Sequence, residues 1–306
     1  MDKDYGESVF DPMKYFEKHP FIMIVIGVIG ISLSSIFIRY SPAPSAVTAT
    51  WRLLWTVILQ TPVILANSQF RQELIAASRK NILLSVLSGL FLAIHFAFWF
   101  ESLRHTSVAS STTIVCTEVI WVSLGYWLFL KGRIGSKAIA AIAVTLCGSA
   151  LIALSDSASG AQLYGDILAL LAAIAVAVYM LLGRVVREKL SASVYTYIVY
   201  LACCAALWIL CALQKESLLA HGVQTVFIGF LLALFSTILG HSIFSWCLKF
   251  FSPSFVSASK LCEPVVAAIL AAILFSEIPG LLQILGAVLI LGGVYYYSLI
   301  ERNEQN

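Results

Sequence analysis

Residues 82–100, ILLSVLSGLFLAIHFAFWF, form an unbroken apolar stretch in which His95 is the only ionisable residue. A helix that crosses a bilayer needs about 20 predominantly apolar residues, because each residue advances the helix by about 1.5 Å. The stretch therefore predicts a membrane-spanning helix. Ten windows of this kind occur in the chain. They open near the following residues: Phe21, Ala46, Ile82, Ala109, Ala138, Asp166, Ser193, Val223, Ser254 and Leu281.

The composition agrees with this pattern. Hydrophobic residues make up 60% of the 306 residues, charged residues make up 11%, and the mean hydropathy is +0.93. Soluble domains carry a much larger share of charged residues. The polar segments are too short to bury a core of their own. The sequence therefore predicts an all-α polytopic membrane protein in the lipid bilayer, without a soluble enzyme domain, and its net charge of +3 gives no reason to expect a nucleic-acid partner.

The cysteine pattern argues against a metal-binding protein, and the N-terminal segment argues against a protein with a cleaved signal peptide. All seven cysteines fall within apolar windows, with no CxxC pair and no histidine at ligand spacing. They are predicted to be reduced and buried, and neither a metal site nor a cofactor is expected. The first 20 residues are charged and aromatic, which is unlike a cleaved signal peptide. The first span is therefore interpreted as an uncleaved anchor.

Lysine and arginine are distributed unevenly between the two sides of the membrane. If the N-terminus is cytoplasmic, 14 basic residues fall on the cytoplasmic side. Only Arg39, Arg104 and Lys215 fall on the opposite side, and Arg52 and Lys260 lie inside spans. Cytoplasmic loops of membrane proteins carry an excess of lysine and arginine. Both termini are therefore predicted to be cytoplasmic.

The last five spans repeat the first five. A shift of 145 residues aligns the fourth and fifth spans with the ninth and tenth without a gap, and it superposes Glu118 on Glu263 and Gly148 on Gly293. An intramembrane glutamate matches by chance less readily than leucine does. Because each half contains an odd number of spans, the two halves must lie in opposite orientations. The sequence thus predicts ten transmembrane helices in two inverted five-helix repeats.

The repeat divides the chain into two units with short tails. The first repeat is predicted at residues 21–155 and the second at residues 164–300. Residues 1–20 and 301–306 are predicted to be cytoplasmic tails.

Inverted repeats are typical of secondary transporters, which bind substrate near the midplane between the halves. The chain contains no HExxH, GxSxG or P-loop motif, so no catalytic residue and no nucleotide hydrolysis are expected. The prediction is a transporter, not an enzyme, whose energy source, if any, is an ion or solute gradient. A scaffold or a channel without a substrate cycle remains the alternative from another class.

Several motifs carry a family resemblance that extends from about Phe21 to Ile300. They are Trp51-Arg52-Leu53-Leu54 in the second span, Glu263-Pro264-Val265 and Phe275-Ser276-Glu277 in the ninth, and QILGAVLILGGV at residues 283–294 in the tenth. In these features the chain resembles the EamA type of the drug/metabolite transporter superfamily. The resemblance implies ten spans and a carrier of small organic metabolites, often an exporter.

The first half departs from this family pattern at two places. Glu118 is followed by Val119 and not by proline, and Lys131-Gly132-Arg133 replaces the usual acidic end of the fourth span. The fourth span is therefore expected to be less kinked than the ninth, in which Pro264 removes a backbone donor.

Charged residues in the middle of spans are expensive to insert and usually face a cavity or a partner. Glu118 and Glu263 should both lie near the midplane, and Glu118 is interpreted as a contact for a substrate ammonium or a coupling proton. The alternative is a neutral structural glutamic acid. Lys260 lies three residues before Glu263, where an ion pair is expected to keep Glu263 charged. Lys260 itself is the candidate for holding a substrate carboxylate.

Histidines and tryptophans on the same spans complete the candidate site. Trp51, His95 and Trp99 are expected to form an aromatic wall with Glu118 and Lys260, suited to stacking on an aromatic ring or to holding an organic cation.

Two further residues are candidates for a gate or for coupling. They are Arg52, which could also snorkel to the interface, and His241, which lies near the position that corresponds to His95. Structural roles for the two histidines are the alternative.

Four glycines in the fifth and tenth spans are predicted to permit close helix packing, including packing in a homodimer. They are Gly148, Gly286, Gly292 and Gly293.

Together these features predict a secondary-active or exchange transporter of small zwitterionic metabolites that works by alternating access. The substrates would be amino acids or amino-acid-bearing nucleoside compounds such as S-adenosylmethionine, with a proton as a candidate coupling ion. The alternative substrate class is hydrophobic organic cations, exported by a multidrug carrier of the same superfamily. The compact loops suit a bacterial inner membrane.

Overall fold

The computed structural model of the chain describes residues 16–106, 108–155, 163–263, 265–266, 269 and 280–305. These residues form helices and contain no strand, which confirms the all-α class for the described part of the chain. Several sequence predictions concern residues outside these ranges. They are the tail up to residue 15, Ser107, the loop around Ser157, Pro264 and the segment Phe275-Ser276-Glu277.

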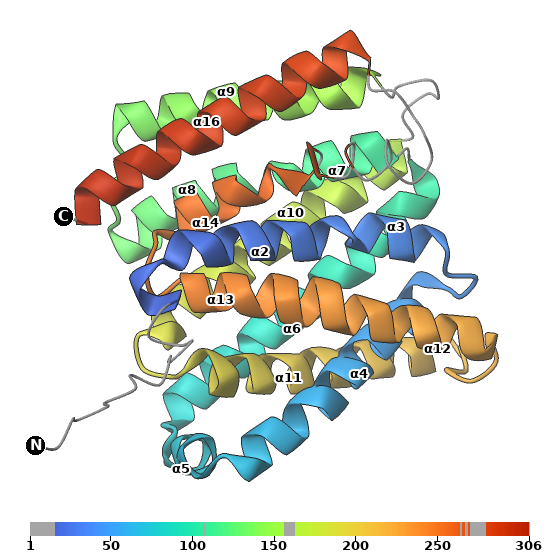
Figure 1. Cartoon of the computed structure of the whole chain (residues 1–306). Coiled ribbons are helices and arrows are strands. Elements are labelled where there is room, and N and C mark those ends of the chain that lie inside the picture. The colour runs from blue at the N-terminus through green and yellow to red at the C-terminus, as the bar shows by residue number, and fades with distance from the viewer. Residues whose placement is uncertain are drawn as a thin grey trace, which may run out of the picture.

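The helices divide between the two halves of the chain (Figure 1). Those of the first half are α2 (Pro20–Ser32), α3 (Ser34–Arg39), α4 (Ser45–Ala66), α5 (Ser68–Ala76), α6 (Arg79–His105), α7 (Val108–Cys116), α8 (Glu118–Leu130) and α9 (Ser136–Ser155). Those of the second half are α10 (Leu163–Arg187), α11 (Ala192–Leu213), α12 (Gly222–Leu231), the π-helix η1 (Leu232–Ser242), α13 (Ile243–Cys247), α14 (Pro253–Lys260) and α16 (Leu281–Gln305).

Eight helical segments of the described residues are long and apolar enough to cross a membrane. They are Pro20–Ile38, Ser45–Ala66, Arg79–His105, Ser111–Leu130, Leu163–Arg187, Ala192–Leu213, Gly222–Cys247 and Leu281–Asn303. These coincide with eight of the ten predicted spans. The fifth predicted span corresponds to α9, whose segment Ser136–Leu151 is a shorter apolar helix. The ninth begins with α14 and then enters residues that are only partly described, so the total of ten stays a prediction.

Helices from the two halves pack against one another throughout the central bundle. Helix α6 lies between α10 and α11, α4 packs against α11 and α12, and α2 packs against η1 and α13. Helix α8 packs against α10 and α14. The interior of the bundle is therefore shared by the first and second halves (Figure 1).

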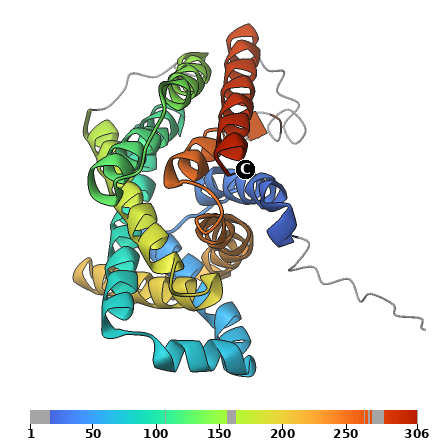
Figure 2. The ribbon, with the colours of Figure 1, turned by 90° about the vertical axis from the view of Figure 1, so that its left-hand side faces the viewer.

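Helices α9 and α16 form a pair at one edge of the bundle (Figures 1 and 2). A Cβ atom on Gly148 would lie 2.7 Å from the carbonyl oxygen of Gly286, and one on Gly293 would collide with Thr145. The close-packing role predicted for Gly148 and Gly293 is thus confirmed within a single chain, and Gly286 lies at the contact with Gly148. Gly292 differs, because nothing lies within 4 Å of the Cβ that it lacks. Homodimer formation stays a prediction.

Four segments near the middle of the bundle depart from regular α-helix. Helices α2 and α3 are separated at Leu33, α7 and α8 at Thr117, and α14 ends before a turn at Leu261 and Cys262. The fourth is η1, which is 11 residues long. π-Helices usually occur as single turns, often at functional sites.

The interruption in the first half was not expected, because no proline follows Glu118. The hydroxyl of Thr117 donates to the carbonyl oxygen of Ile114 at 2.6 Å, which competes with the helical backbone hydrogen bonds. The shift of 145 residues superposes Thr117 on Cys262. Both repeats are therefore interrupted at equivalent positions, and the comparison of their kinks at Pro264 lies outside the described residues.

Candidate functional site

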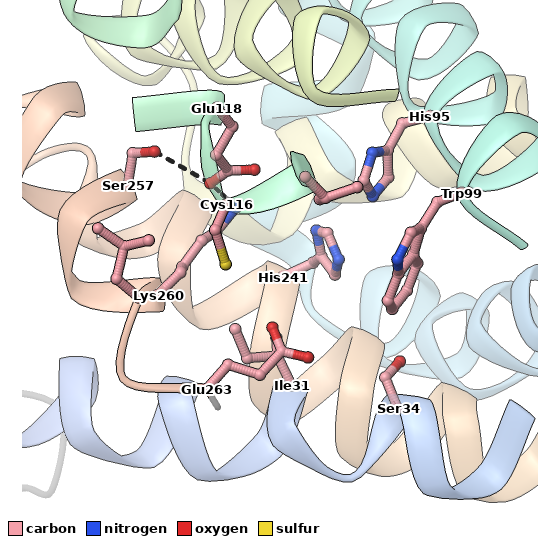
Figure 3. Close-up of a pocket in the computed structure, with 12 residues that line it drawn as sticks. Ile31, Ser34, His95, Trp99, Cys116, Glu118, His241, Ser257, Lys260 and Glu263 are labelled. Carbon is pink, nitrogen blue, oxygen red and sulfur yellow. Dashed lines mark hydrogen bonds and ion pairs between the residues drawn. The ribbon is translucent and has the colours of Figure 1, made fainter. Parts of the chain in front are cut away.

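A cavity lies between the interrupted segments of both halves (Figure 3). It is lined by Ile31, Ser34, His95, Trp99, Val115, Cys116, Glu118, His241, Ser257, Lys260, Leu261 and Glu263. The space open to water-sized molecules is about 50 Å³. This volume holds a few water molecules but no amino acid. Substrate entry at this place therefore requires the surrounding helices to move apart.

The two repeats contribute equivalent positions to the wall of this cavity. The first repeat contributes Val115, Cys116 and Glu118. The residues 145 positions later are Lys260, Leu261 and Glu263, which line the same cavity. The cavity thus takes equivalent positions from both repeats, and transporters built from inverted repeats bind substrate at the interface between the repeats.

Local sequence signals hold the charged residues at the cavity. Ser252 is the N-cap of helix α14, and its Oγ accepts a hydrogen bond from the backbone N–H of Phe255 at 3.2 Å, while Pro253 occupies the first turn. This is a favourable N-terminus for a helix. Two turns later, Lys260 is its last residue. Glu118 is the first residue of α8, directly after the interruption at Thr117.

Lys260 and Glu118 form a buried ion pair across the two halves. The Lys260 Nζ lies 2.7 Å from Glu118 Oε1, and Ser257 Oγ donates to the same oxygen at 3.0 Å (Figure 3). The Lys260 Nζ also contacts Met180 Sδ at 3.6 Å. An ion pair in a low-dielectric interior is screened far less than one at a surface. The sequence had indicated Glu263 as the partner of Lys260, and the structure corrects this, because the packing of α14 against α8 brings Lys260 to Glu118.

Glu263 lines the cavity without a counter-ion in contact. Among the described residues, none donates a hydrogen bond to its carboxylate or forms an ion pair with it. Its side chain extends into the cavity beside Ile31 (Figure 3). Of the two carboxylates in the cavity, Glu263 is therefore the one open to a cationic group.

Aromatic rings form the opposite wall of the cavity. The rings of His95 and Trp99 stack with centroids 5.8 Å apart, and the ring of His241 lies 6.4 Å from that of His95. The Nδ1 of His95 is hydrogen-bonded to the carbonyl oxygen of Ala172 at 3.0 Å. The indole N–H of Trp99 is buried and has no partner among the described residues. It is a donor that a ligand could use.

Trp51 is not part of this wall. Its Nε1 donates to the carbonyl oxygen of Leu218 at 2.9 Å, and its side chain packs against Cys211 and neighbouring apolar residues. Its aromatic character, read without the fold, suggested a substrate contact. The structure places it in a packing position outside the cavity.

Arg52 lies behind the wall of the cavity and is fully buried. Its Nε donates to Thr237 Oγ1 at 2.7 Å, and its Nη1 donates to the cavity-lining Ser34 at 3.3 Å. The guanidinium lies over the ring of Phe96, 4.3 Å from the centroid. Its Nη2 has no partner among the described residues. Arg52 thus does not snorkel to the interface but connects α4 with the irregular segments α3 and η1.

We expect the variant Arg52→Lys to be destabilised by about 2 kcal/mol, because an ammonium lacks the planar fork that reaches Thr237 and Ser34 together. Thermal unfolding of the detergent-solubilised protein measures the loss. Arg184→Lys is the matched control, since Arg184 donates to a backbone carbonyl away from the cavity. An Arg52→Lys protein as stable as the wild type would contradict this bridging role.

Sequence reasoning missed some lining residues. Ser34, Cys116 and Ser257 are small residues in apolar spans and gave no charge or size signal. A position-based signal could have found one of them. Ser257 precedes Lys260 by three residues, on the same face of a helix. Within the described residues, no three His, Cys, Asp or Glu side chains are grouped to hold a metal ion.

Comparison with known proteins decides the family. The sequence model of the EamA-like transporter family matches residues 20–154 and again residues 163–299. The chain belongs to the EamA-like transporter family. As a member of the drug/metabolite transporter superfamily, this EamA protein is an integral membrane transporter, and the two matches correspond to the two repeats.

Relatives of this EamA protein are also named as transporters. An uncharacterized transporter of Bacillus subtilis is 27% identical over 292 residues, which cover 93% of this chain and 89% of the relative. A probable amino-acid metabolite efflux pump of Salmonella typhimurium is 27% identical over 274 residues, which cover 81% of this chain and 91% of the relative. A solved crystal structure superposes with a TM-score of 0.78 at 15% identity, over 93% of this chain and 99% of that one, so the fold is shared.

Proposed function

We propose that this EamA transporter carries small zwitterionic metabolites that bear an amino acid group, by alternating access through the central cavity. The observation that carries the proposal is the buried Lys260–Glu118 pair beside the unpaired Glu263, in a cavity shared by both halves. The site thus offers cationic and anionic groups within one small space. A zwitterion matches both signs and adds no net charge to the membrane interior.

The donors and acceptors at the cavity support a carboxylate and an ammonium as the recognised groups. The Lys260 ammonium has three N–H donors, of which one is used by Glu118 and one points at a weakly accepting sulfur. A substrate carboxylate can therefore bind Lys260 and the free indole N–H of Trp99. Glutamate carboxylates in the cavity can hold the ammonium. The stacked His95 and Trp99 rings offer a flat surface for an aromatic or nucleoside portion.

The proposal also covers the number of helices, their orientation in the membrane and a second conformation of the cavity. We infer ten helices in two inverted repeats, with both termini cytoplasmic in a bacterial inner membrane, because 14 basic residues then fall on the cytoplasmic side. The small cavity of this conformation requires a second, open conformation for loading and release. The name of the Salmonella typhimurium relative, an amino-acid metabolite efflux pump, supports the substrate class and the direction of export.

The test is counterflow in proteoliposomes that are preloaded with one unlabelled solute and offered the same solute with a label. The solutes are L-phenylalanine, S-adenosylmethionine, glucose 6-phosphate and tetraphenylphosphonium. We expect saturable uptake of one of the amino-acid-bearing solutes, accelerated by the internal solute. Uptake confined to tetraphenylphosphonium would indicate an exporter of organic cations. The absence of any saturable flux would overturn the proposed function.

Glu118→Gln is expected to lower transport of the amino-acid-bearing solute by at least about tenfold, because a charged hydrogen bond is lost. The variant should still fold, since a glutamine oxygen can accept from Ser257 and Lys260. Initial uptake rates at several pH values give the measurement. Glu101→Gln is the matched control, because Glu101 pairs with His105 outside the cavity. A Glu118→Gln protein with the wild-type rate and pH dependence would remove Glu118 from the mechanism.

A further inference from the structure

One lysine faces two glutamates that are related by the internal repeat. Lys260 is bound to Glu118 in the other half of the chain at 2.7 Å. Glu263 lies three residues after Lys260 and lines the same cavity. The shift of 145 residues that relates the repeats superposes Glu118 on Glu263, whereas the residue equivalent to Lys260 is the apolar Val115. Both repeats therefore supply a glutamate at the equivalent position, whereas the second repeat alone supplies the lysine.

The backbone between Lys260 and Glu263 forms a tight turn in this conformation. Helix α14 ends at Lys260, and Leu261 and Cys262 form a turn whose backbone N–H groups donate to Ala258 and Ser259. In a continuous α-helix, residues at i and i+3 are neighbours and pair readily. Because only one such turn separates the two residues along the chain, a change in side-chain conformation can bring the Glu263 carboxylate to the Lys260 ammonium.

The electrostatics favour an exchange of partners over a permanent three-residue cluster. Each carboxylate is expensive to leave charged in a low-dielectric cavity without a counter-ion, and Lys260 can neutralise only one of them. The carboxylate that Lys260 does not bind must then be neutralised in another way, by another cation or by a proton. In this conformation that carboxylate is Glu263.

We propose that Lys260 exchanges its partner between Glu118 and Glu263 during the transport cycle. In the conformation described here, Lys260 holds Glu118 and ties the two halves together, and Glu263 is the site for an ammonium group. In the opposite conformation, Lys260 holds Glu263 within its own half, the link between the halves is released, and Glu118 becomes the ammonium site. The assignment of the ammonium to substrate rests on the proposed function, but the exchange of partners does not.

The native Cys116 offers a reporter for the conformation of the empty carrier, because it lines the cavity. A full-length variant that retains Cys116 and has its other six cysteines replaced by alanine is labelled with a membrane-impermeant methanethiosulfonate. Labelling rates are measured in right-side-out and in inverted membrane vesicles. The ratio of the two rates reports which side of the membrane the cavity faces.

The proposal predicts opposite effects of two equivalent substitutions on this ratio. In Glu263→Gln, Glu118 is the one carboxylate of the two that can still bind Lys260, so the variant favours the conformation described here. In Glu118→Gln, Glu263 is the one carboxylate of the two that can still bind Lys260, so the variant favours the opposite conformation. Each ratio should shift by about tenfold or more, in opposite directions, as expected for the gain or loss of a charged hydrogen bond. Glu101→Gln should leave the ratio unchanged.

The two glutamine substitutions are also made in a protein that carries Lys260→Met. Without the lysine, the two glutamine variants should no longer differ in the direction of their shift. Shifts in the same direction, or no shift from either glutamine variant, would overturn the exchange of partners. If a glutamine variant does not fold, Glu118→Asp and Glu263→Asp replace it, with smaller shifts expected in the same directions. Because labelling needs no substrate, its outcome is independent of the counterflow test of the proposed function.

Discussion

Lys260→Met is expected to lower the free energy of unfolding by about 3–5 kcal/mol and to abolish measurable transport of amino-acid-bearing solutes. Lys260 is 9% exposed and Glu118 is 5% exposed, so the pair is largely removed from water. Removal of the lysine leaves the Glu118 carboxylate buried with the Ser257 hydroxyl as its only donor within the described part of the chain. Thermal unfolding in detergent and counterflow in proteoliposomes measure the two effects.

The double variant Lys260→Met/Glu118→Gln separates the structural effect from the functional one. It removes both charges, so no isolated ion remains, and stability should return to near the wild-type value. Transport should stay absent, because the groups proposed to hold the zwitterion are gone. Recovery of transport in the double variant would show that the pair serves only to hold the helices together. Persistent transport of tetraphenylphosphonium would instead favour the organic-cation alternative.

Gly89→Ala is expected to destabilise the protein by about 3 kcal/mol, at the upper end of the usual range for overpacking. A Cβ atom at Gly89 would overlap the carbonyl oxygen of Val199 in α11 and lie 2.8 Å from the Cβ of Ala202. Backbone atoms cannot rotate away as a long side chain does. Helices α6 and α11 would therefore have to separate, which would displace His95 and Trp99, both of which lie on α6.

Gly292→Ala is the matched control for this substitution. It makes the same chemical change in a long apolar helix, but nothing lies within 4 Å of its added Cβ. We expect it to leave the unfolding temperature unchanged or slightly raised, since alanine is the better helix former. Equal effects of the two substitutions would show that helix propensity, and not the contact between α6 and α11, decides the result.

The position of the ion pair explains how the site and the movement of the protein are connected. Glu118 begins α8 and Lys260 ends α14, so the pair joins one interrupted helix from each half. Any motion that opens the cavity between α8 and α14 must act on this contact. A substrate that competes for either charge therefore alters the balance between conformations, because a ligand shifts an equilibrium through its different affinity for the two states.

Much of the candidate site followed from the rule that charges inside a membrane face a cavity or a partner. His95, Trp99, Glu118, His241, Lys260 and Glu263 were all singled out from the sequence and all line the cavity. Trp51 was singled out with Trp99 as part of an aromatic wall and lies elsewhere, because tryptophan is common both in binding sites and in helix packing. Arg52 was ambiguous until its contacts with Thr237 and Ser34 placed it behind the wall.

The sequence by itself determined the all-α class, the membrane location and the internal repeat, because long apolar windows and a fixed shift of 145 residues are properties of the chain alone. Only the tertiary structure decided which charges meet. Lys260 and Glu263 are neighbours in sequence and suggested a local pair. The packing of α14 against α8 places Glu118 beside Lys260, and Lys260 binds Glu118 instead. Long-range contacts of this kind depend on where helices break and cross, which apolar windows do not encode.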